Sequence, residues 1–441
     1  MTSSEGGSST TSGASQAGGH VLDELEWRGL VHQTTNLQGL HDHLRAPQLV
    51  YCGFDPTRDS LTIGNLVGIC LLKRFQEMGH RPVVVMGGGT GMIGDPSGKD
   101  SERQLLDAAQ IEANVAGQRP IFERLLRFDG DSAAVIVNNA DWLAKLSFVE
   151  VLRDVGKHFA VNMMIQKDSV RTRLESREQG ISYTEFSYMI LQAYDFQYLH
   201  RTRGVTVQVG GSDQWGNIVA GVDLTRRTER TEVYGLTAPL LTKADGGKFG
   251  KTESGAVWLT RKYTSPYAFY QFWINAADAD LGRFLKVFSF KSRQEIEALL
   301  DEHAKDPGQR LGQRALAEEL TSLLHGEEGL AEARAATEAL FSGQVRGLSA
   351  AVLDDAFASA PSTTHSLAEL EGEGKDIAEL LVEAGAVKSK REAREHLGNG
   401  AVALNGERVD ASFRLTRDAL LHGHVALLRR GKKNWHVTRW I

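Results

Sequence analysis

Two predicted strands with a helix between them, all within residues 49–89, constrain the fold of this chain more than any other feature. LVYCGF (49–54) is typical of a buried strand, NLVGICLLKRFQEMG (65–79) has the apolar spacing of a helix, and PVVVMGGG (82–89) is a second apolar strand that runs into glycines. A strand, a helix and a strand in this order form a βαβ unit, which requires a parallel sheet. We therefore predict the α/β fold class, with another buried strand at VTVQVGG (205–211).

Polar segments directly follow three of the predicted strands. They lie at 55–60, 95–103 and 211–217. Ligands of parallel sheets bind beyond the carboxyl ends of the strands, where such segments meet. We therefore expect a binding site at that edge of the sheet.

Charge is distributed unevenly along the chain. The formal net charge is -6, which argues against nucleic-acid binding over the whole surface. From Lys388 to Ile441, however, there are twelve Lys or Arg and five Asp or Glu, a local charge of +7. This excess predicts a carboxyl-terminal module that meets phosphate backbones, and a merely solvated basic face is the alternative.

The chain has only two cysteines, Cys52 and Cys70, and no Cys or His cluster with zinc spacing. We expect neither a disulfide framework nor a structural metal, which fits a reducing cytosol and predicts a cytoplasmic location. The first residues are rich in Ser, Thr and Gly and do not resemble a secretory signal. No apolar run of about 18 residues occurs, so no membrane partner is expected.

Two glycine-rich segments are similar to nucleotide-binding motifs without matching them. GTGMIG (89–94) fits the dinucleotide pattern of nicotinamide enzymes, but DPSG follows at once and ends any helix there. GGKFGKT (246–252) nearly matches a P-loop, yet Asp245 occupies the position of its first glycine. A surface loop is the plain alternative for the second segment. Its two lysines could instead neutralise charge on a leaving pyrophosphate.

Polar side chains also occur where the surrounding sequence is apolar. On the predicted helix SYTEFSYMILQAYDFQYL (182–199), Tyr188, Gln192 and Asp195 share one stripe. The alternatives are a buried helix with locally satisfied groups and a polar ligand that pairs with them. Asp213 and Gln214 follow a strand between glycines, as a turn or as a ribose site.

Six segments in order resemble the bacterial-type tyrosyl-tRNA synthetases, which are class I enzymes. The resemblance covers nearly the whole chain from about residue 21, and a final segment resembles the S-four type of RNA-binding module. The six segments are YCGFDPTRDSLTIGNL, GDPSGKDSER, YTEFSYMILQAYDF, QVGGSDQWGN, KFGKTESGAVWL and SPYAFYQFWIN, and the final one is SKREAREHLGNGAVALNGERV.

The resemblance implies a domain organisation. A Rossmann-like catalytic domain is followed by a helical domain for the anticodon arm of tRNA and by a small α+β module that binds RNA. The predicted bounds are a flexible tail at 1–20, the catalytic domain with the KFGKT loop at 21–262, the helical domain at 263–348, a linker at 349–374 and the RNA-binding module at 375–441.

The resemblance also implies which residues bind tyrosine. The phenol hydroxyl would be held by two side chains, the ammonium group by three, and the region between tyrosine and the α-phosphate by two more. These residues are Tyr51 and Asp195, then Asp95, Tyr188 and Gln192, then Asp55 and Gln214. A pocket that pairs the phenol with buried polar groups rejects phenylalanine, because those groups would be left unpaired.

A second implied set binds ATP, which enters with Mg²⁺ as a substrate while the protein holds no tightly bound metal. The ribose would be held by Cys52, Gly211 and Asp213, and the phosphates by Thr57, Lys99, Arg103, Lys248, Lys251 and Thr252. The tyrosine carboxylate attacks the α-phosphorus, so catalysis consists of positioning and charge stabilisation rather than protein nucleophilicity.

One signature departs from the family. The usual His-Ile-Gly-His reads Thr62-Ile63-Gly64-Asn65 here. Thr62 and Asn65 can still donate hydrogen bonds to the ATP phosphates beside Gly64, but neither becomes cationic near neutral pH. Asn65 could alternatively be a helix N-cap.

The implied partners are L-tyrosine, ATP, tRNA(Tyr) and a second copy of the chain in a homodimer, with the interface near 149–166. The sister tryptophan enzyme is a rival, which Tyr51 with Asp195 disfavours. An RNA-binding protein that has lost catalysis is another rival, which the intact KFGKT segment disfavours.

Overall fold

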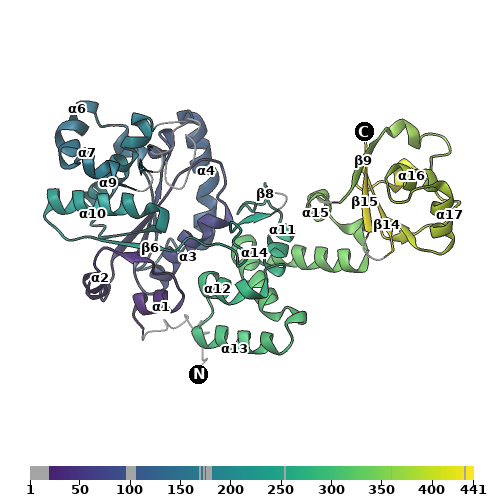
Figure 1. The fold of residues 1–441 in the computed structure, drawn as a ribbon, viewed down its shortest axis with the longest axis horizontal. Helices are drawn as coiled ribbons and strands as arrows, with labels where there is room; N and C mark the ends of the chain where they lie inside the picture. Colours follow the sequence, from purple (N-terminus) through teal and green to yellow (C-terminus); the bar gives the residue numbers. More distant parts are fainter. Residues whose placement is uncertain are drawn as a thin grey trace, which may run out of the picture. The chain divides into compact units, whose positions relative to one another are not determined.

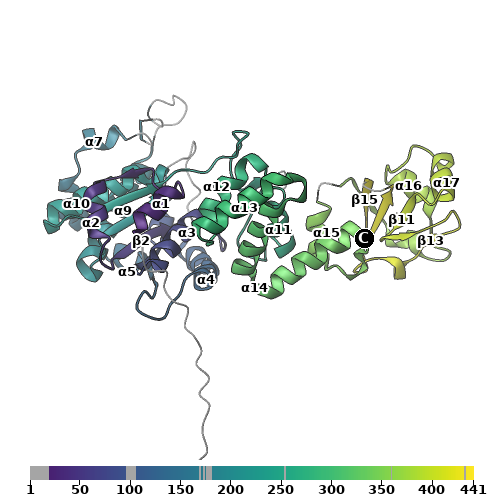
Figure 2. The same ribbon diagram turned by 90° about the horizontal axis from the view of Figure 1, so that it is seen from below.

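The computed structural model describes residues 19–95, 106–167, 170–171, 174, 181–252, 255–358, 360–431 and 434–441. The chain divides into two compact units (Figures 1 and 2). One comprises Met1–Asp59 and Asn65–Leu241, and the other comprises Ser60–Gly64 and Thr242–Ile441.

A six-stranded sheet with the strand order β1-β6-β5-β2-β3-β4 is the centre of the first unit. The five strands from β6 to β4 are parallel, and only the edge strand β1 runs antiparallel to β6. The strands are β1 (Gln33–Thr34), β2 (Leu49–Phe54), β3 (Arg81–Met86), β4 (Val135–Asn138), β5 (Val207–Gly211) and β6 (Tyr234–Ala238). The predicted parallel sheet is confirmed, and β2 has the predicted bounds.

Helices cover both faces of this sheet, because consecutive residues of a strand point to opposite sides. Tyr51 of β2 packs edge-on against Phe196 on one face, with ring centroids 5.2 Å apart. Phe54 of the same strand packs against Phe122 on the other face, at 4.8 Å. The covering helices are α3 (Ile63–Glu77) and α4 (Ala108–Leu125) on one face, and α9 (Tyr183–Arg203) and α10 (Trp215–Glu229) on the other.

The strand order places a topological switch between β2 and β5. The chain passes from β2 to β3 on one side and later enters β5 on the other side of β2. In open parallel sheets, ligands bind in the crevice at the carboxyl ends of two such strands. The predicted binding edge is therefore found where β2 and β5 end.

Short helices complete the first unit. Two of them, α6 and α7, flank a π-helical turn, a conformation that is often found at functional sites. The short elements are α1 (Val21–Trp27), α2 (Leu37–His43), η1 (Thr90–Met92), α5 (Ala140–Leu143), α6 (Phe148–Glu150), η2 (Val151–Val155), η3 (Gly156–His158), α7 (Val161–Ile165) and η4 (Ser212–Gln214).

After the short strands β7 and β8, the second unit continues with helices, in agreement with the predicted helical region. The longest of the described helices, α14, is interrupted at Gly326 by a backbone conformation of φ 75° and ψ 176° that favours glycine. Phe249 contributes to an aromatic cluster with Trp273 and Phe288. The elements are β7 (Lys251–Thr252), β8 (Gly255–Ala256), α11 (Pro266–Ile274), α12 (Asp278–Phe288), α13 (Arg293–Lys305), η5 (Pro307–Gln309), α14 (Leu311–Ser342), η6 (Val345–Gly347) and α15 (Ala350–Ala356).

The carboxyl-terminal part has the predicted α+β composition. A five-stranded sheet with the order β12-β11-β14-β15-β9 packs with two helices around its own apolar core. The elements are β9 (Ser362–His365), η7 (Leu367–Leu370), β10 (Lys375–Asp376), α16 (Ile377–Glu383), α17 (Lys390–Gly398), β11 (Val402–Leu404), β12 (Glu407–Arg408), β13 (Arg414–Leu415), η8 (Arg417–Ala419), β14 (Val425–Arg430) and β15 (Asn434–Trp440).

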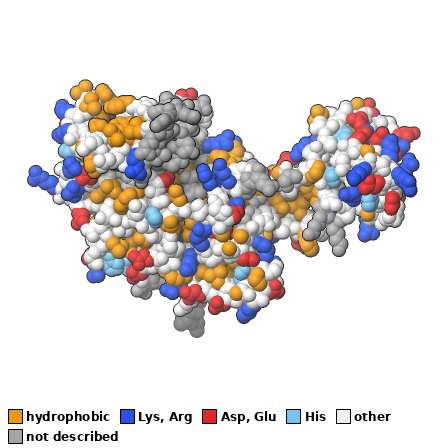
Figure 3. Space-filling model, in the orientation of Figure 1, with side chains coloured by type: hydrophobic (Ala, Val, Ile, Leu, Met, Phe, Trp, Pro, Cys, Tyr) orange, Lys and Arg blue, Asp and Glu red, His pale blue; other side chains and the backbone are white. Residues whose placement is uncertain are grey.

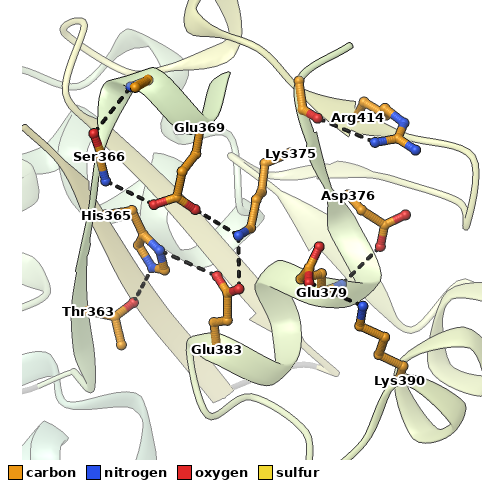
Figure 4. A network of polar contacts seen from close by, with 12 residues as sticks. Thr363, His365, Ser366, Glu369, Lys375, Asp376, Glu379, Glu383, Lys390 and Arg414 are labelled. Carbon is orange, nitrogen blue, oxygen red and sulfur yellow. Dashed lines mark hydrogen bonds and ion pairs between the residues drawn. The ribbon is translucent and has the colours of Figure 1, made fainter. Parts of the chain in front are cut away.

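The stretch 349–374, expected as a linker, contains α15 as well as β9 and η7. β9 pairs in parallel with β15, so these residues are part of the sheet. Figure 4 shows how side chains fasten this stretch: the Lys375 ammonium contacts Glu369 at 2.7 Å and Glu383 at 2.8 Å, and the His365 ring lies 3.5 Å from Glu383. β9 has the polar sequence Ser-Thr-Thr-His, and sequence periodicity therefore could not predict it.

The predicted end of the catalytic domain, at residue 262, also differs from the boundary between the two compact units. The unit boundary lies between Leu241 and Thr242, and Ser60–Gly64 join the second unit. The reason is backbone pairing: Ile63 N–H donates to Val257 O at 2.9 Å, and Leu259 N–H donates to Leu61 O at 2.8 Å. None of the helices in the described part of the chain is long and apolar enough for a membrane span.

Candidate active site

Asp195 is the most constrained carboxylate of the first unit. It lies on α9, is 3% exposed, and accepts hydrogen bonds from Trp142 Nε1 at 2.7 Å and from Asn139 Nδ2 at 2.9 Å. Burial raises its pKa to about 7, although the two hydrogen bonds act in the opposite direction. The carboxylate is therefore held in one orientation and titrates close to neutral pH.

The Tyr51 hydroxyl is buried beside this carboxylate. Tyr51 is 1% exposed, and its hydroxyl has no hydrogen-bond partner among the residues that the structure describes. Burial and the negative charge of Asp195 raise the Tyr51 pKa well above its usual value. An unpaired buried hydroxyl costs roughly 1–3 kcal/mol, so a ligand hydroxyl placed here would relieve that cost.

A second carboxylate, Asp55, follows β2 and is also held by side chains. It accepts hydrogen bonds from Thr90 Oγ1 at 2.9 Å and from Tyr188 Oη at 3.1 Å. Gly87 permits this approach, because a Cβ atom at that position would lie 2.2 Å from Asp55 Oδ1. The sequence predicted that Tyr188, Gln192 and Asp195 share one stripe of a helix. All three lie on α9, where Tyr188 and Asp195 are buried and Gln192 is partly exposed.

Asp95, Asp213 and Gln214 meet at the end of β5. Gln214 Nε2 donates to Asp95 Oδ2 at 2.6 Å and to Asp213 Oδ2 at 3.4 Å. Burial raises the pKa of Asp213, and the charge of Asp95 adds to this effect. A Cβ atom on Gly211 would lie 2.5 Å from Asp213 Oδ1, so any other residue at position 211 would displace this carboxylate.

Cys52 lies on the face of β2 opposite to Tyr51, close to Gly68 of α3. Burial raises its pKa to about 12, so the thiol stays protonated. The group can act as a hydrogen-bond donor but not as a nucleophile at neutral pH.

The loop after β2 holds its backbone firmly and exposes Thr57. Asn114 Nδ2 donates to Pro56 O at 2.8 Å, and Gln118 Nε2 donates to Arg58 O at 2.9 Å. The side chains of both amides come from α4, so the loop is clamped against that helix. Lys99 and Arg103, expected to bind phosphate, lie outside the described residues.

The other expected phosphate residues belong to the second unit, where the Thr62 signature and the KFGKT segment lie side by side. Thr62 forms a β-bridge with Trp258, and Gly250 has φ +79° with its Cβ position 2.5 Å from Ile63 Cγ2. Any side chain at Gly250 would collide with the signature. Lys248 and Lys251 are exposed, and the Thr252 backbone continues β7.

The alternative role of Asn65 as a helix N-cap is wrong. α3 begins at Ile63, so exposed Asn65 lies within its first turn rather than before it. Gly64 is also exposed, and only Thr62 Oγ1 lies near the position of a Cβ atom there, at 3.6 Å.

Sequence reasoning missed Asn139, Trp142 and Thr90. The first two follow β4, a strand that was not predicted, and the rule that ligands bind after parallel strands would have found them with that strand. Thr90 was considered only as part of a glycine-rich pattern.

Two clusters in the described part of the chain have side chains close enough to hold a metal ion, and neither includes the residues above. One is His20 with Asp23 and His41, and the other is His365 with Glu369 and Glu383. In the second cluster the Lys375 ammonium already forms ion pairs with both glutamates. The first has its His20 Nδ1 engaged by the Leu22 N–H at 3.1 Å.

Two family models match the chain. The model described as tRNA synthetases class I (W and Y) matches residues 44–342, and the model described as Tyrosine--tRNA ligase SYY-like C-terminal domain matches residues 353–438. The second match begins ahead of β9, in agreement with the place of that strand in the sheet.

Curated relatives are similar over nearly their whole length. The tyrosine--tRNA ligase of Bacillus caldotenax is 52% identical over 424 residues, which cover 95% of this chain and 99% of that protein. The tyrosine--tRNA ligase of Staphylococcus epidermidis is 49% identical over 423 residues, with the same coverage of 95% and 99%.

A solved structure agrees. The C-terminally truncated mitochondrial tyrosyl-tRNA synthetase of Aspergillus nidulans superimposes with a TM-score of 0.67 at 30% identity, and the match covers 73% of this chain and 94% of that one. The nicotinamide, tryptophan and non-catalytic alternatives are set aside by these matches. With about 50% identity to tyrosine--tRNA ligases over 95% of its length, the chain belongs to the tyrosine--tRNA ligase family of class I tRNA synthetases.

Proposed function

We propose that the phenol hydroxyl of the tyrosine substrate binds between Tyr51 and Asp195. The single observation that carries this proposal is the buried Tyr51 hydroxyl without a partner, next to a carboxylate that already has two donors. A phenol can donate to Asp195 and accept from Tyr51, which satisfies both groups. Phenylalanine can do neither, so the same buried groups exclude it.

The remaining polar groups fit the other end of the amino acid. We assign the ammonium group to Asp95, Tyr188 and Gln192, and the region near the α-phosphate to Asp55 and Gln214. Asp95 supplies a carboxylate, and Tyr188 and Gln192 supply further oxygen acceptors, which are the groups that an ammonium needs.

ATP enters as its Mg²⁺ complex, and the ion belongs to the nucleotide. The ribose is assigned to Cys52, Gly211 and Asp213, where the thiol and the carboxylate offer a donor and an acceptor. Thr57, Lys99, Arg103, Lys248, Lys251 and Thr252 are assigned to the phosphates, with Thr62, Gly64 and Asn65 at the start of α3. The lysine and arginine cations of this set would stabilise the charge that develops on leaving pyrophosphate.

Tyrosine-dependent exchange of labelled pyrophosphate into ATP tests these assignments. Tyr51→Phe should lower kcat/KM for tyrosine about 10- to 100-fold and leave the KM for ATP within about threefold, because only one buried hydrogen bond is lost. Tyr263→Phe, at a tyrosine of the second unit, is the matched control. An unchanged preference for tyrosine over phenylalanine in Tyr51→Phe would refute the phenol site.

The carboxyl-terminal module is assigned to the tRNA backbone. Lys388, Arg391 and Arg394 on and before α17 are exposed and have no ion pair among the described residues, unlike Lys390, which pairs with Glu379. Replacement of Lys388, Arg391 and Arg394 by glutamate should reduce the rate of tRNA charging at least about tenfold and leave pyrophosphate exchange unchanged. Wild-type tRNA charging by this variant would refute the assignment.

The helical region from α11 to α14 is assigned to the anticodon arm.

Dimerisation is supported by an exposed apolar patch on α6, η2 and α7. Phe148, Val149, Leu152, Val161 and Met163 are between 48% and 68% exposed, and Figure 3 shows apolar side chains gathered on this face. Such a patch is unusual on a monomer. Met163→Glu should therefore give monomers in light scattering, and a wild-type chain that is itself monomeric would refute the interface. We also propose a cytoplasmic location, where tRNA and ATP are available.

A further inference from the structure

One continuous series of hydrogen bonds joins the two carboxylates of the tyrosine pocket. It begins at Asp195, passes through the Asn139 amide and the Thr90 hydroxyl, and ends at Asp55, which also accepts from Tyr188. The donor–acceptor distances in this order are 2.9 Å, 3.0 Å, 2.9 Å and 3.1 Å.

A backbone group determines the direction of every bond in the series. The Gly89 N–H donates to Asn139 Oδ1 at 2.7 Å, and a backbone N–H can only donate. The two Asn139 amide hydrogens must therefore point to Asp195 and to Thr90. Because the Thr90 hydroxyl accepts from Asn139, its single proton goes to Asp55.

The connecting groups have no access to water. Thr90 is 3% exposed and Asn139 is 1% exposed. Removing the Thr90 hydroxyl would leave a buried Asn139 hydrogen without its acceptor and would take one donor away from the Asp55 carboxylate. The connection also depends on Gly87, whose Cβ atom would lie 2.6 Å from Thr90 Oγ1.

We propose that Thr90 is a positioning residue for tyrosine activation. It connects Asp195, the carboxylate assigned to the phenol hydroxyl, with Asp55, the carboxylate assigned to the other end of the substrate. Thr90 acts through Asn139 and Asp55 rather than on tyrosine itself. Its hydroxyl keeps both ends of the pocket at a constant separation before the substrate arrives. The inference rests on the proposed tyrosine-binding roles of Asp195 and Asp55.

Replacement of the hydroxyl by a methyl group tests this role in the full-length chain. Thr90→Val has almost the same shape and should lower kcat/KM for tyrosine about 10- to 100-fold in pyrophosphate exchange, with the KM for ATP within about threefold. Thr90→Ser retains the hydroxyl and should stay within about threefold of the wild type. A Val variant with wild-type kinetics, or a Ser variant as impaired as Val, would overturn the proposal.

Thr90→Ala provides a second variant in case Val disturbs folding. It cannot overfill the site, and it should show the same selective loss, with circular dichroism and thermal unfolding confirming a folded chain. Wild-type kinetics of a folded Ala variant would also overturn the proposal.

The double variant with Tyr51→Phe distinguishes this inference from the phenol site itself. If Thr90 acts through the phenol end, the fold-decrease in kcat/KM for tyrosine in the double variant should be smaller than the product of the two single fold-decreases by roughly threefold or more. Losses that multiply fully would show that Thr90 does not act on that end. A Tyr51→Phe variant that keeps its preference for tyrosine would instead refute the phenol site and leave the Thr90 kinetics to be judged by the Ser and Val pair.

Discussion

The tyrosine end and the phosphate end of the proposed site are built in opposite ways. At the tyrosine end, Tyr51, Asp195 and Tyr188 are less than 5% exposed, and the carboxylates of Asp195 and Asp55 accept hydrogen bonds from fixed donors. At the phosphate end, Thr57, Lys248 and Lys251 are exposed. To reject phenylalanine, which lacks the hydroxyl, the site needs polar groups that are shielded from water and held in fixed positions. Pyrophosphate carries several negative charges and can be stabilised by several cations at once.

This difference explains where the chain departs from its family pattern. Thr62 and Asn65 replace two signature histidines at the phosphate end, where the proposed cations on other segments share the charge. The expected phenol pair, Tyr51 and Asp195, is present as the resemblance requires. We infer that the phosphate end tolerates the loss of one donor better than the phenol end does.

The largest expected effect tests the phosphate end. Lys251→Ala should slow tyrosyl-adenylate formation about 100- to 1000-fold, because a preorganised charge next to the leaving group would be lost. Single-turnover kinetics with saturating tyrosine and ATP measure this rate. Lys305→Ala, at an exposed lysine of the second unit paired with Glu302, should leave it unchanged. A Lys251→Ala rate equal to that of this control would contradict the assigned role.

A smaller effect is expected at the phenol end. Asp195→Asn should lower kcat/KM for tyrosine about 10- to 100-fold, since the phenol would lose a charged acceptor. Pyrophosphate exchange at pH 8 measures this, where the wild-type carboxylate, with a pKa of about 7, is mostly ionised. An unaltered kcat/KM would remove Asp195 from the site.

The same variant has a predictable pH signature in stability. The folded-state pKa of Asp195 is raised to about 7 from the ordinary 3.8, so the folded state binds the proton more tightly than the unfolded state between these values. Wild-type stability from this group therefore falls as pH rises from about 4 to about 7. The melting temperature of Asp195→Asn minus that of the wild type should rise over this range. A difference that is constant between pH 5 and pH 8 would contradict the raised pKa.

The smallest effect is expected from restoring the signature. Thr62→His combined with Asn65→His should change the KM for ATP by less than about tenfold, because each neutral donor is exchanged for another donor with partial positive charge. Steady-state exchange at pH 6.5 and pH 8 measures the change and its dependence on protonation. A decrease in the KM for ATP of about 100-fold or more would show that the phosphate end depends on individual donors as strongly as the phenol end does.

Much of the fold was predictable because its strands and helices carry strong periodicity. β2 and α9 were predicted with nearly the observed bounds, and the positions after β2 and β5 followed from the rule for parallel sheets. β9 and the Asn139 position were not predictable in this way. β9 is polar and pairs with β15, a strand that is distant from it in the sequence.

The amino-acid sequence by itself determined the α/β class, the family and most of the side chains assigned to tyrosine and ATP, because these depend on local apolar spacing and on motifs within short segments. Only the tertiary structure decided that Asn139, Trp142 and Thr90 support the two carboxylates. It also decided that residues 60–64 pair with the segment after the KFGKT loop. Such contacts join residues that are far apart in the chain, and their energies depend on burial and direction, which no local pattern of residues encodes.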